Sequence, residues 1–300
     1  MVSIMAVLSI GSLNLDYVYT VPHFVQPGET LTATQTEIKA GGKGLNQTLA
    51  LARAGLSVDL VGCIGHDGRS LRELLVANGV DTTRVEEVDA PQGTAFIQVN
   101  KHGENCIVLY PGSNHALTKA QVDAALDELG PDDYVVLQNE TSCVAHTLSE
   151  CARRGLRVVF NPAPCTADVA TMDLSAVSWL IVNEGEALEL TGSSNPREVW
   201  KVLHAKWPNM GLVVTLGKQG SVAFVDDRHK TQKAFDVKTV DTTAAGDTFV
   251  GYFVAGLVDG LSLSTCLRQA SCAAALACTR AGAAPSIPLA HELRELMSGE

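Results

Sequence analysis

Short apolar runs rich in β-branched residues alternate along the chain with segments whose apolar residues recur every three to four positions. The runs are typical of buried strands, and the recurring pattern is typical of helices that pack on a sheet. The predicted strands cover residues 6–10, 58–61, 134–137, 157–160, 179–182, 212–216 and 221–225. The predicted helices cover residues 44–54, 70–78, 119–129, 143–153, 196–206, 245–258 and 264–279. This alternation predicts an α/β fold with a mainly parallel sheet covered on both faces.

Two pairs of strand-like segments depart from this alternation. Residues 94–100 and 105–110 are joined by a short polar turn and predict a hairpin. Residues 16–20 and 30–39 flank the turn Gln26-Pro27-Gly28. Together the two pairs predict a small separate sheet. Because no linker or internal repeat interrupts the chain, we expect residues 1–300 to form a single domain with a β appendage at about residues 14–38 and 94–112.

Composition and charge narrow the class of protein. A length of 300 residues with 46% apolar residues fits one large α/β domain, and a net charge of −11 argues against nucleic acid as a partner. Residues 1–10 lack the basic start of a signal peptide, and the chain has no run of about 18 apolar residues that could cross a membrane. The eight cysteines form no C-x-x-C pair, so we expect reduced thiols and a cytoplasmic location.

The segment 241–249 (Asp-Thr-Thr-Ala-Ala-Gly-Asp-Thr-Phe) joins small residues to an apolar helix. A helix N-terminus carries unpaired N–H groups and a partial positive charge, and small residues there allow a phosphoryl group to approach the backbone. Asp247 falls in the first turn, where an acid also interacts favourably with the helix dipole without any catalytic role. The glycine directly before it favours the catalytic interpretation, since capping does not require such small residues.

A second glycine-rich turn, Gly41-Gly42-Lys43-Gly44, opens an amphipathic helix. Its glycines allow a substrate to approach the backbone, while Lys43 and Asn46 offer hydrogen-bond donors. It is not a Walker A loop, because Lys43 is followed by glycine and not by Ser or Thr. Taken alone, the turn is explained equally well as an ordinary structural feature.

Acidic and amide side chains follow two of the predicted strands. Asn14 and Asp16 point to the same side at period two and suit vicinal hydroxyl groups, although a loop Asx turn is the alternative. Asn183 and Glu186 suit the water shell of a bound Mg²⁺, although a helix N-cap with a Glu three residues later fits their spacing better. The segment 215–220 is an equally ambiguous strand–turn signal. The motifs H-E-x-x-H and G-x-S-x-G are absent, so hydrolase and metal-catalyst hypotheses lack support.

In this order, the motifs resemble those of the ribokinase family of carbohydrate kinases, over residues 11–288. The Gly-Gly-Lys-Gly-x-Asn-Gln loop at 41–47 and the Asp-Thr-x-Ala-Ala-Gly-Asp-Thr-Phe segment at 241–249 carry most of the likeness. Further matches are Asn-Pro-Ala-Pro at 161–164, Asn-x-x-Glu at 183–186, Thr-Leu-Gly at 215–217 and Thr-Arg-x-Gly-Ala-x-Pro-Ser at 279–286. The resemblance implies a three-layer αβα ribokinase-like fold with a β-sheet lid that forms a homodimer interface.

The resemblance also assigns roles to individual residues. Asp247 would be the catalytic base, next to an anion hole at Ala244, Ala245 and Gly246. The sugar contacts would be Asn14, Asp16, Gly42, Lys43, Asn46, Glu140 and Asp247. The nucleotide contacts would be Asn183, Thr215, Gly217, Gly220 and Gly246. Glu186 would help to organise Mg²⁺, and a monovalent cation, usually K⁺, would be held by Asp241, Thr243, Ala277, Arg280, Gly282 and Ser286.

Three departures from the family pattern bear on specificity. Ser271 stands where a His often contacts the adenosine, the lid segment 109–114 is bulkier than expected for a ribose enzyme, and the Gly-x-Asp-x-x-Gly pattern ends in Ser70. The expected activity is ATP-dependent phosphorylation of a small sugar, first of all D-ribose to ribose 5-phosphate. A fructokinase, a deoxyribokinase and a nucleoside kinase are alternatives within the same class. A sugar-binding sensor without catalysis is the alternative from another class.

Overall fold

The computed structural model describes residues 5–226 and 228–298, so the first four residues of the apolar N-terminal segment lie outside it. Within the described residues, nine strands form the central sheet in the order β13-β12-β11-β10-β9-β8-β1-β4-β5. Their bounds are β1 Val7–Ile10, β4 Val58–Ile64, β5 Val85–Glu87, β8 Tyr134–Gln138, β9 Arg157–Asn161, β10 Val177–Asn183, β11 Gly211–Thr215, β12 Ser221–Val225 and β13 Arg228–Gln232.

The central sheet is parallel from β5 to β11, and only β12 and β13 run antiparallel to their neighbours. Strand β1 lies between β4 and β8, so consecutive parts of the chain leave it in opposite directions across the sheet. In open α/β sheets, ligands bind beyond the carboxyl ends of the strands at such a switch in strand order. The topology therefore places the expected site beyond β1 and β8.

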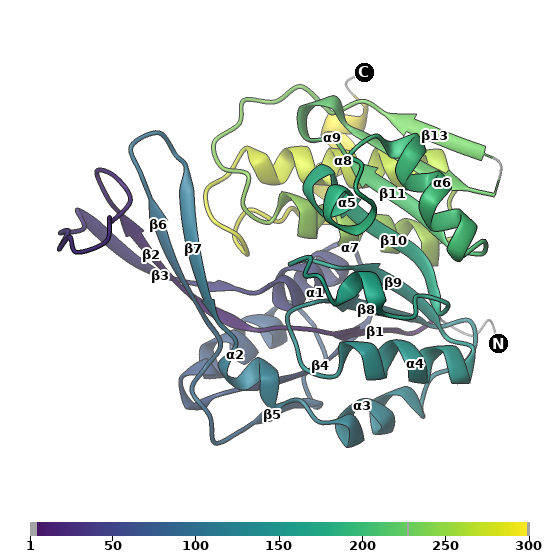
Figure 1. The fold of residues 1–300 in the computed structure, drawn as a ribbon, viewed down its shortest axis with the longest axis horizontal. Coiled ribbons are helices and arrows are strands. Elements are labelled where there is room, and N and C mark those ends of the chain that lie inside the picture. Colours follow the sequence, from purple (N-terminus) through teal and green to yellow (C-terminus); the bar gives the residue numbers. More distant parts are fainter. Residues whose placement is uncertain (1–4, 227, 299–300) are drawn as a thin grey trace.

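Helices cover both faces of this sheet (Figure 1). Alternate strand residues point to opposite sides, so Val7 and Val136 join one core while Leu8 and Val135 join the other. Against the first core pack α1 Lys43–Arg53, α2 Arg69–Ala77, α7 Ala245–Val258, α8 Leu263–Cys278 and α9 Ala290–Ser298. Against the second pack α3 Lys119–Leu126, α4 Val144–Arg154, α5 Glu184–Thr191 and α6 Pro196–Lys206.

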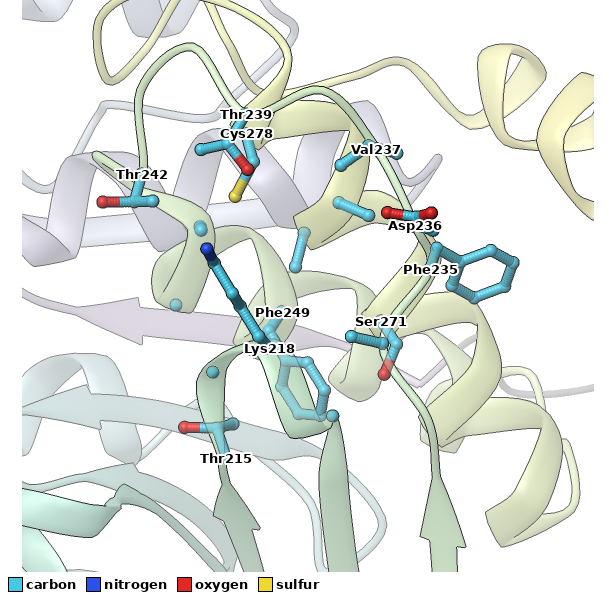
Figure 2. Close-up of a pocket in the computed structure, with 17 residues that line it drawn as sticks. Thr215, Lys218, Phe235, Asp236, Val237, Thr239, Thr242, Phe249, Ser271 and Cys278 are labelled. Carbon is cyan, nitrogen blue, oxygen red and sulfur yellow. The ribbon is translucent and has the colours of Figure 1, made fainter.

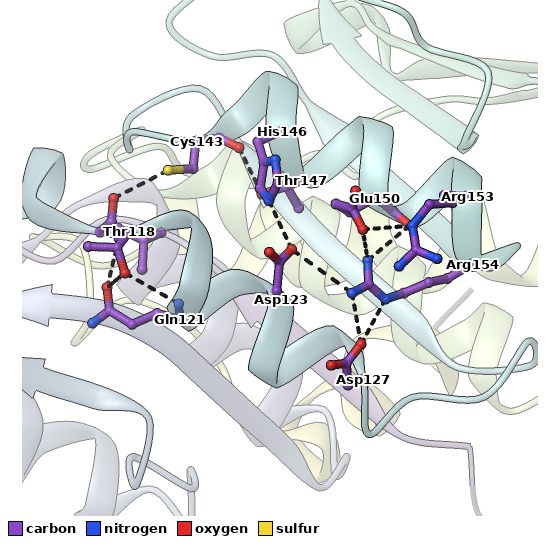
Figure 3. Close-up of polar contacts among 11 residues, drawn as sticks. Thr118, Gln121, Asp123, Asp127, Cys143, His146, Thr147, Glu150, Arg153 and Arg154 are labelled. Carbon is purple, nitrogen blue, oxygen red and sulfur yellow. Dashed lines mark hydrogen bonds and ion pairs between the residues drawn. The ribbon is translucent and has the colours of Figure 1, made fainter.

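Polar contacts join α3 and α4, which pack side by side on the second face of the sheet (Figure 3). Thr118 and Gln121 form a capping box that begins α3. His146 of α4 contacts Asp123 at 2.9 Å, and Arg154 contacts Asp127 at 2.8 Å. These groups hold two neighbouring helices together, and we assign them no part in ligand binding.

A second sheet has the order β3-β2-β6-β7, with bounds β2 Asn14–Thr20, β3 Gln35–Gly41, β6 Thr94–Val99 and β7 Asn105–Tyr110. It projects from the body as an arm (Figure 1). Its apolar side chains are only partly covered, with Val108 65% and Ile38 62% exposed. The arm is therefore not packed like the central sheet, and we call these four strands the lid.

The predicted α/β architecture, with its hairpin and separate small sheet, is confirmed. The predicted strand 30–39 was too long, because regular pairing starts only at Gln35. The predicted helix 119–129 ends at Leu126. Among the strands and α-helices of the described residues, β5, β13, α5 and α9 were not predicted. No helix in the described ranges is long and apolar enough to cross a membrane.

Candidate active site

The carboxyl ends of five adjacent strands bring predicted site residues to one edge of the sheet. Asn14 and Glu140 follow β1 and β8 by a few residues, while Asn183 and Thr215 end β10 and β11. Asn161, which ends β9, lies between them in the strand order. The N-termini of α1 and α7 reach the same region, since Asn46 and Gln47 of α1 donate hydrogen bonds to Asp247 of α7, and the two helices pack closely further along. A Cβ added at Gly251 of α7 would lie 2.4 Å from the Ala50 Cβ, so glycine is needed for this close approach.

Asp247 lies in the first turn of α7 and is 8% exposed. Asn46 Nδ2 donates to one carboxylate oxygen and Gln47 Nε2 to the other, each at 3.0 Å. The helix begins after Ala244, whose left-handed backbone (φ 60°) is uncommon for a non-glycine residue. The N–H groups of Gly246 and Asp247 have no partner among the described residues. A buried carboxylate therefore lies beside a helix N-terminus that is free to bind an anion.

Two further carboxylates, an ammonium group and two amides lie near Asp247. We call Asn14, Asp16, Lys43, Asn46, Glu140 and Asp247 the polar cluster. Glu140 Oε2 accepts hydrogen bonds from Ser12 Oγ at 2.5 Å and from the Lys43 backbone N–H at 3.0 Å. Burial alone lowers the pKa of the Lys43 ammonium group, but Asp247, Glu140 and Glu186 outweigh burial and leave that pKa raised. Lys43 is therefore charged at neutral pH.

Asp16 is the carboxylate of the polar cluster with the most perturbed environment. Burial, followed by the negative charges of Glu140 and Asp247, raises its pKa to about 7. Gly41 lies directly against it, because a Cβ there would be 2.0 Å from Asp16 Oδ2. Glycine at position 41 therefore makes room for the Asp16 carboxylate.

Asn14 is held in one orientation by a residue that the sequence did not assign to the site. The Leu13 backbone N–H can only donate, and it donates to Asn114 Oδ1 at 2.9 Å. Asn114 Nδ2 therefore faces Asn14, and it donates to Asn14 Oδ1 at 2.7 Å. Because its oxygen is used in this bond, Asn14 has only its NH₂ group left to offer a ligand.

A cavity of about 610 Å³ lies next to the N-terminus of α7, and the residues that line it are drawn in Figure 2. Its lining includes Thr215, Gly217 and Gly220, as predicted, together with Phe249 and Ser271. We call it the small-residue cavity, since alanines, glycines and threonines make up much of its wall. Ala245 and Gly246 also line it, so the N-terminus of α7 separates this cavity from the polar cluster.

Asn183 and Glu186 bind each other. The Asn183 side chain accepts a hydrogen bond from the Glu186 N–H at 2.9 Å, and Glu186 Oε2 accepts one from the Asn183 N–H at 3.0 Å. This capping box begins α5, so the helix-cap interpretation of their spacing is confirmed. Burial raises the pKa of Glu186, partly offset by the Asn183 N–H and by Lys43. In the described part of the chain, Asn183 is not among the residues that line the small-residue cavity.

The predicted cation ligands come from two loops that Asp241 holds together. Asp241 Oδ1 accepts hydrogen bonds from the Thr243 N–H at 2.9 Å and from its hydroxyl at 2.7 Å, while Oδ2 accepts one from the Gly282 N–H at 2.8 Å. Burial alone raises the pKa of Asp241, but these hydrogen bonds outweigh burial and lower it. Buried Ser286 donates to the Ala283 carbonyl at 2.7 Å. Of the other predicted carbonyls, that of Ala277 lies in the last turn of α8 and that of Arg280 just after this helix, and the Arg280 N–H donates to Ala277 O at 3.1 Å.

Several polar residues of the site were not predicted from the sequence: Ser12, Gln47, Asn114 and Gln138. Gln138 gave a usable signal, because it is a polar residue at the end of an otherwise apolar strand. Gln47 belongs to the glycine-rich motif at 41–47, but no local pattern identifies the partners of Ser12, Gln47 and Asn114, which lie about 100 to 200 positions away in the chain.

A free helix N-terminus, a buried carboxylate and a polar cluster on one side, with a cavity on the other, are the parts needed to transfer a phosphoryl group to a hydroxyl. The sequence of residues 5–290 matches the model of the pfkB family of carbohydrate kinases. The chain therefore belongs to the pfkB family, and it is a sugar kinase of the ribokinase type.

Relatives extend over nearly the whole chain. A ribokinase of Haemophilus influenzae is 38% identical over 301 residues, covering 96% of this chain and 97% of that protein. The crystal structure of a ribokinase from Cryptococcus neoformans var. grubii serotype A in complex with ADP has a TM-score of 0.86 at 35% identity, covering 97% and 99%. The structure of an Arabidopsis thaliana ribokinase with ribose and ATP has a TM-score of 0.84 at 26% identity, covering 98% of each chain.

Proposed function

We propose that this sugar kinase transfers the γ-phosphoryl group of ATP to D-ribose and produces ribose 5-phosphate, with Asp247 as the catalytic base. The observation that carries the proposal is the position of Asp247, which lies in the polar cluster, in the first turn of α7 and directly after Ala245 and Gly246, which line the small-residue cavity. The names of the relatives support ribose as the sugar and ATP as the donor.

An aspartate is far too weak a base to deprotonate a free alcohol. Phosphoryl transfer through a loose transition state does not require it, because the hydroxyl becomes acidic only as its bond to phosphorus forms. Asp247 then orients the hydroxyl and accepts its proton late in the reaction. Its burial excludes water, which would otherwise compete for the phosphoryl group.

The N-terminus of α7 suits the transferred phosphoryl group. The N–H groups of Gly246 and Asp247 are free to donate, and a Cβ added at Gly246 would meet nothing within 4 Å. The helix dipole and the nearby Lys43 ammonium add positive potential at this position. Negative charge that develops during transfer would thus be stabilised by groups that are already in place.

The polar cluster offers a sugar both donors and acceptors. Asn14 presents its NH₂ group, whereas Asp16 and Glu140 present carboxylate oxygens. Asn46 Oδ1 is buried without a partner in the described residues, and such an acceptor is costly unless a ligand hydroxyl donates to it. The backbone at Gly42 and the Lys43 side chain complete the proposed sugar contacts. Vicinal hydroxyls of a small sugar fit this alternation of donors and acceptors.

Magnesium fits the site only together with the nucleotide. Mg²⁺ prefers oxygen ligands and usually keeps several waters beside one or two carboxylates and the substrate phosphates. In the described ranges, no three His, Cys, Asp or Glu residues form a group that could hold a metal ion by themselves. Glu186, with its raised pKa and its place in the capping box, would act through a bound water. When bound, the ion would neutralise phosphate charge.

A monovalent cation fits the loops joined by Asp241, because the donor set there consists of oxygens alone. Asp241 is ionised, and the carbonyls at Thr243, Ala277, Arg280 and Gly282 and the Ser286 hydroxyl are hard ligands. The cation would fix the loop that leads into α7 and add positive potential beneath it. We expect a several-fold higher rate and a higher melting temperature (Tm) in K⁺ than in a bulky organic cation at equal ionic strength. Equal rates and equal Tm values would contradict this part of the proposal.

The nucleotide base would lie in the small-residue cavity near Ser271, whose hydroxyl is 3.5 Å from that of Ser221. Thr215, Gly217 and Gly220 would contact the nucleotide there. Asn183, at the end of the adjacent strand β10, would contact it as well. With a serine instead of a ring at position 271, we expect weak discrimination between ATP and other purine nucleotides. Comparing kcat/KM for ATP and GTP measures this.

A substrate screen tests the proposed sugar. A coupled assay of ADP release should give its highest kcat/KM with D-ribose among pentoses, hexoses, 2-deoxyribose and nucleosides. A relative named deoxyribokinase, from Salmonella typhi, is 29% identical over 98% of this chain, so 2-deoxyribose is the sharpest comparison. A higher kcat/KM with another acceptor would refute ribose but leave the kinase assignment intact. ADP release that no sugar stimulates would favour a sugar sensor.

The exposed apolar residues of the lid support a homodimer as part of the proposal. Val108, Ile38, Ile107 and Phe96 are all more than 40% exposed, an unusual density for a free surface. Sedimentation should give a dimer for the wild type and a monomer for Val108→Asp, and a monomeric wild type would contradict the proposed dimer.

The free thiols of all eight cysteines support a cytoplasmic location as part of the proposal.

A further inference from the structure

Behind Asp247, on the side away from the cavity, lies a row of amide side chains that the mechanism has not yet used. Gln47 Nε2 donates to Asp247 Oδ1 and to Asn161 Oδ1, both at 3.0 Å. Asn161 Nδ2 donates to the Ile181 backbone carbonyl at 2.9 Å, and Gln138 Nε2 donates to Gln47 Oε1 at 2.8 Å. These residues come from α1, β9, β10 and β8, so four elements meet behind one carboxylate.

The orientation of every amide in this row follows from one backbone group. The Ile181 carbonyl can only accept, so the NH₂ group of Asn161 must face it and Asn161 Oδ1 must face Gln47. An oxygen there requires a donor, so the NH₂ group of Gln47 faces Asn161, and its second hydrogen is directed to Asp247. If the Gln47 amide flipped, its oxygen would face two acceptors and its NH₂ group would face the donor on Gln138.

Burial makes this order costly to lose. Gln47 is 0% exposed, Gln138 is 1% exposed, and Asp247 is 8% exposed. No solvent replaces a missing partner in such surroundings, so each amide keeps the orientation that its neighbour imposes. Gln47 is also shielded from the ligand space, whereas its neighbour Asn46 carries an unpartnered oxygen. The contribution of Gln47 to catalysis would therefore pass through Asp247.

We propose that Gln47 is a positioning residue for Asp247, and that Asn161 and Gln138 hold its amide in the orientation that donates to the carboxylate. The inference rests on the proposed role of Asp247 as the base. With Oδ1 anchored by Gln47 and Oδ2 by Asn46, the carboxylate cannot rotate about its Cβ–Cγ bond. The remaining lone pairs then keep a fixed direction toward the acceptor hydroxyl, and a small misplacement of a reacting group is sufficient to slow transfer considerably.

The test is a double-mutant cycle on the full-length protein. Gln47→Met keeps the length of the side chain but cannot donate, and we expect kcat to fall about 10- to 100-fold while the KM for sugar changes less than about threefold. In an Asp247→Asn background, Gln47→Met should cause almost no further loss of kcat, because its effect passes through the carboxylate. Equal losses of kcat in both backgrounds would overturn the inference.

Two further variants separate positioning from folding. Thr48→Val is the matched control, since the Thr48 hydroxyl is fully buried on the same helix and contacts Gly44 O and Ser9 Oγ, both at 2.7 Å. It should lower Tm as Gln47→Met does but leave kcat unchanged.

Gln138→Met removes only the hydrogen bond that Gln47 Oε1 accepts. It should lower kcat about 3- to 10-fold in the wild type and cause almost no further loss in the Asp247→Asn background. A control that slows kcat as much as Gln47→Met refutes positioning. A normal rate in Asp247→Asn alone refutes the proposed base instead.

Discussion

The two sides of the α7 N-terminus are built from different parts of the polypeptide. On the side of the polar cluster, the groups that face the proposed ligand are side chains. Asn14, Glu140 and Asp247 are each fixed by hydrogen bonds to other elements. On the side of the small-residue cavity, the wall consists largely of small residues, and the free donors are backbone N–H groups at Gly246 and Asp247.

This difference matches the two proposed ligands. A sugar is neutral and is distinguished from its relatives by the directions of its hydroxyls, so it requires donors and acceptors in fixed orientations. A triphosphate is strongly charged and is bound well by any backbone that it can approach closely. We therefore expect the polar cluster to be damaged by changes that keep the size of a side chain but alter its chemistry. The cavity should be damaged by changes that add atoms.

The largest effect is expected for Asp247→Asn, which keeps size and removes the proton acceptor. We expect kcat to fall by about 10²–10⁴, the range of general-base catalysis. The fold should tolerate the change, because Asn46 Oδ1 has no partner and can turn to accept from the new NH₂ group. Measuring kcat, sugar affinity and Tm on this one variant separates the roles. A near-normal kcat with a lowered Tm would reduce Asp247 to a partner of the helix dipole.

The next largest effect is expected on the cavity side, at Gly246. A Cβ at Gly246 would meet no atom within 4 Å, so the protein itself has room for it. Since alanine is the better helix former, Gly246→Ala should raise stability by about 0.5–1 kcal/mol. The same methyl group would occupy the space of the approaching phosphate, so kcat/KM for ATP should fall roughly 10- to 100-fold. Gly246→Val should lower it further. An unchanged kcat/KM for ATP in both variants would show that the phosphate does not bind at Gly246.

The sequence predicted the parts of the molecule that depend on local pattern. Apolar runs located the buried strands closely, and small residues before Phe249 located the start of α7. Strand β13 was missed because it is an exposed edge strand whose residues, Arg228 to Gln232, are all polar. Helix α5 was missed because it is short and buries little beyond Ala187. Burial leaves a pattern in the sequence only where an element is mostly covered.

The site was predictable to a similar extent. Residue types and spacing pointed to Asp247, Asn14 and Asp16, but not to how they are held. Gln47 meets Asp247 across 200 positions and Asn161 across 114, and no local signal encodes such pairs. The direction of the Asn14 amide likewise depends on Asn114, which lies 100 positions away in the chain, just after β7. Orientation is a property of long-range contacts, and the polar cluster depends on orientation more than the cavity does.

The third prediction concerns the pH dependence of sugar binding. The polar cluster contains Asp16, whose carboxyl group has a pKa of about 7, so sugar binding should depend on pH more than ATP binding does. Above pH 7 Asp16 is ionised and accepts hydrogen bonds from sugar hydroxyls, and below pH 7 it binds a proton and loses acceptor capacity. We expect kcat/KM for sugar to fall about tenfold between pH 8 and pH 6, while the KM for ATP stays nearly constant. Asp16→Asn should have a high sugar KM that is independent of pH. A pH dependence that persists in this variant would implicate another group.

The smallest expected effect is on stability, and its sign is opposite to that of binding. The pKa of Asp16 is higher in the folded protein than the ordinary value of 3.8, so the folded state binds the extra proton between pH 4 and 7. The contribution of Asp16 to stability is therefore fully present below pH 4 and is lost as pH rises through 7. Asp16→Asn, which has no charge to bury, should raise Tm at pH 8 by about 2–6 °C and change it little at pH 5.

The control Asp132→Asn removes a carboxylate that is 75% exposed and should leave Tm nearly unchanged at both pH values. An equal Tm shift at pH 5 and pH 8 would mean that packing, and not the buried charge, limits stability at Asp16. A rise confined to high pH would mean that the polar cluster gains its acceptor for sugar at the expense of the fold.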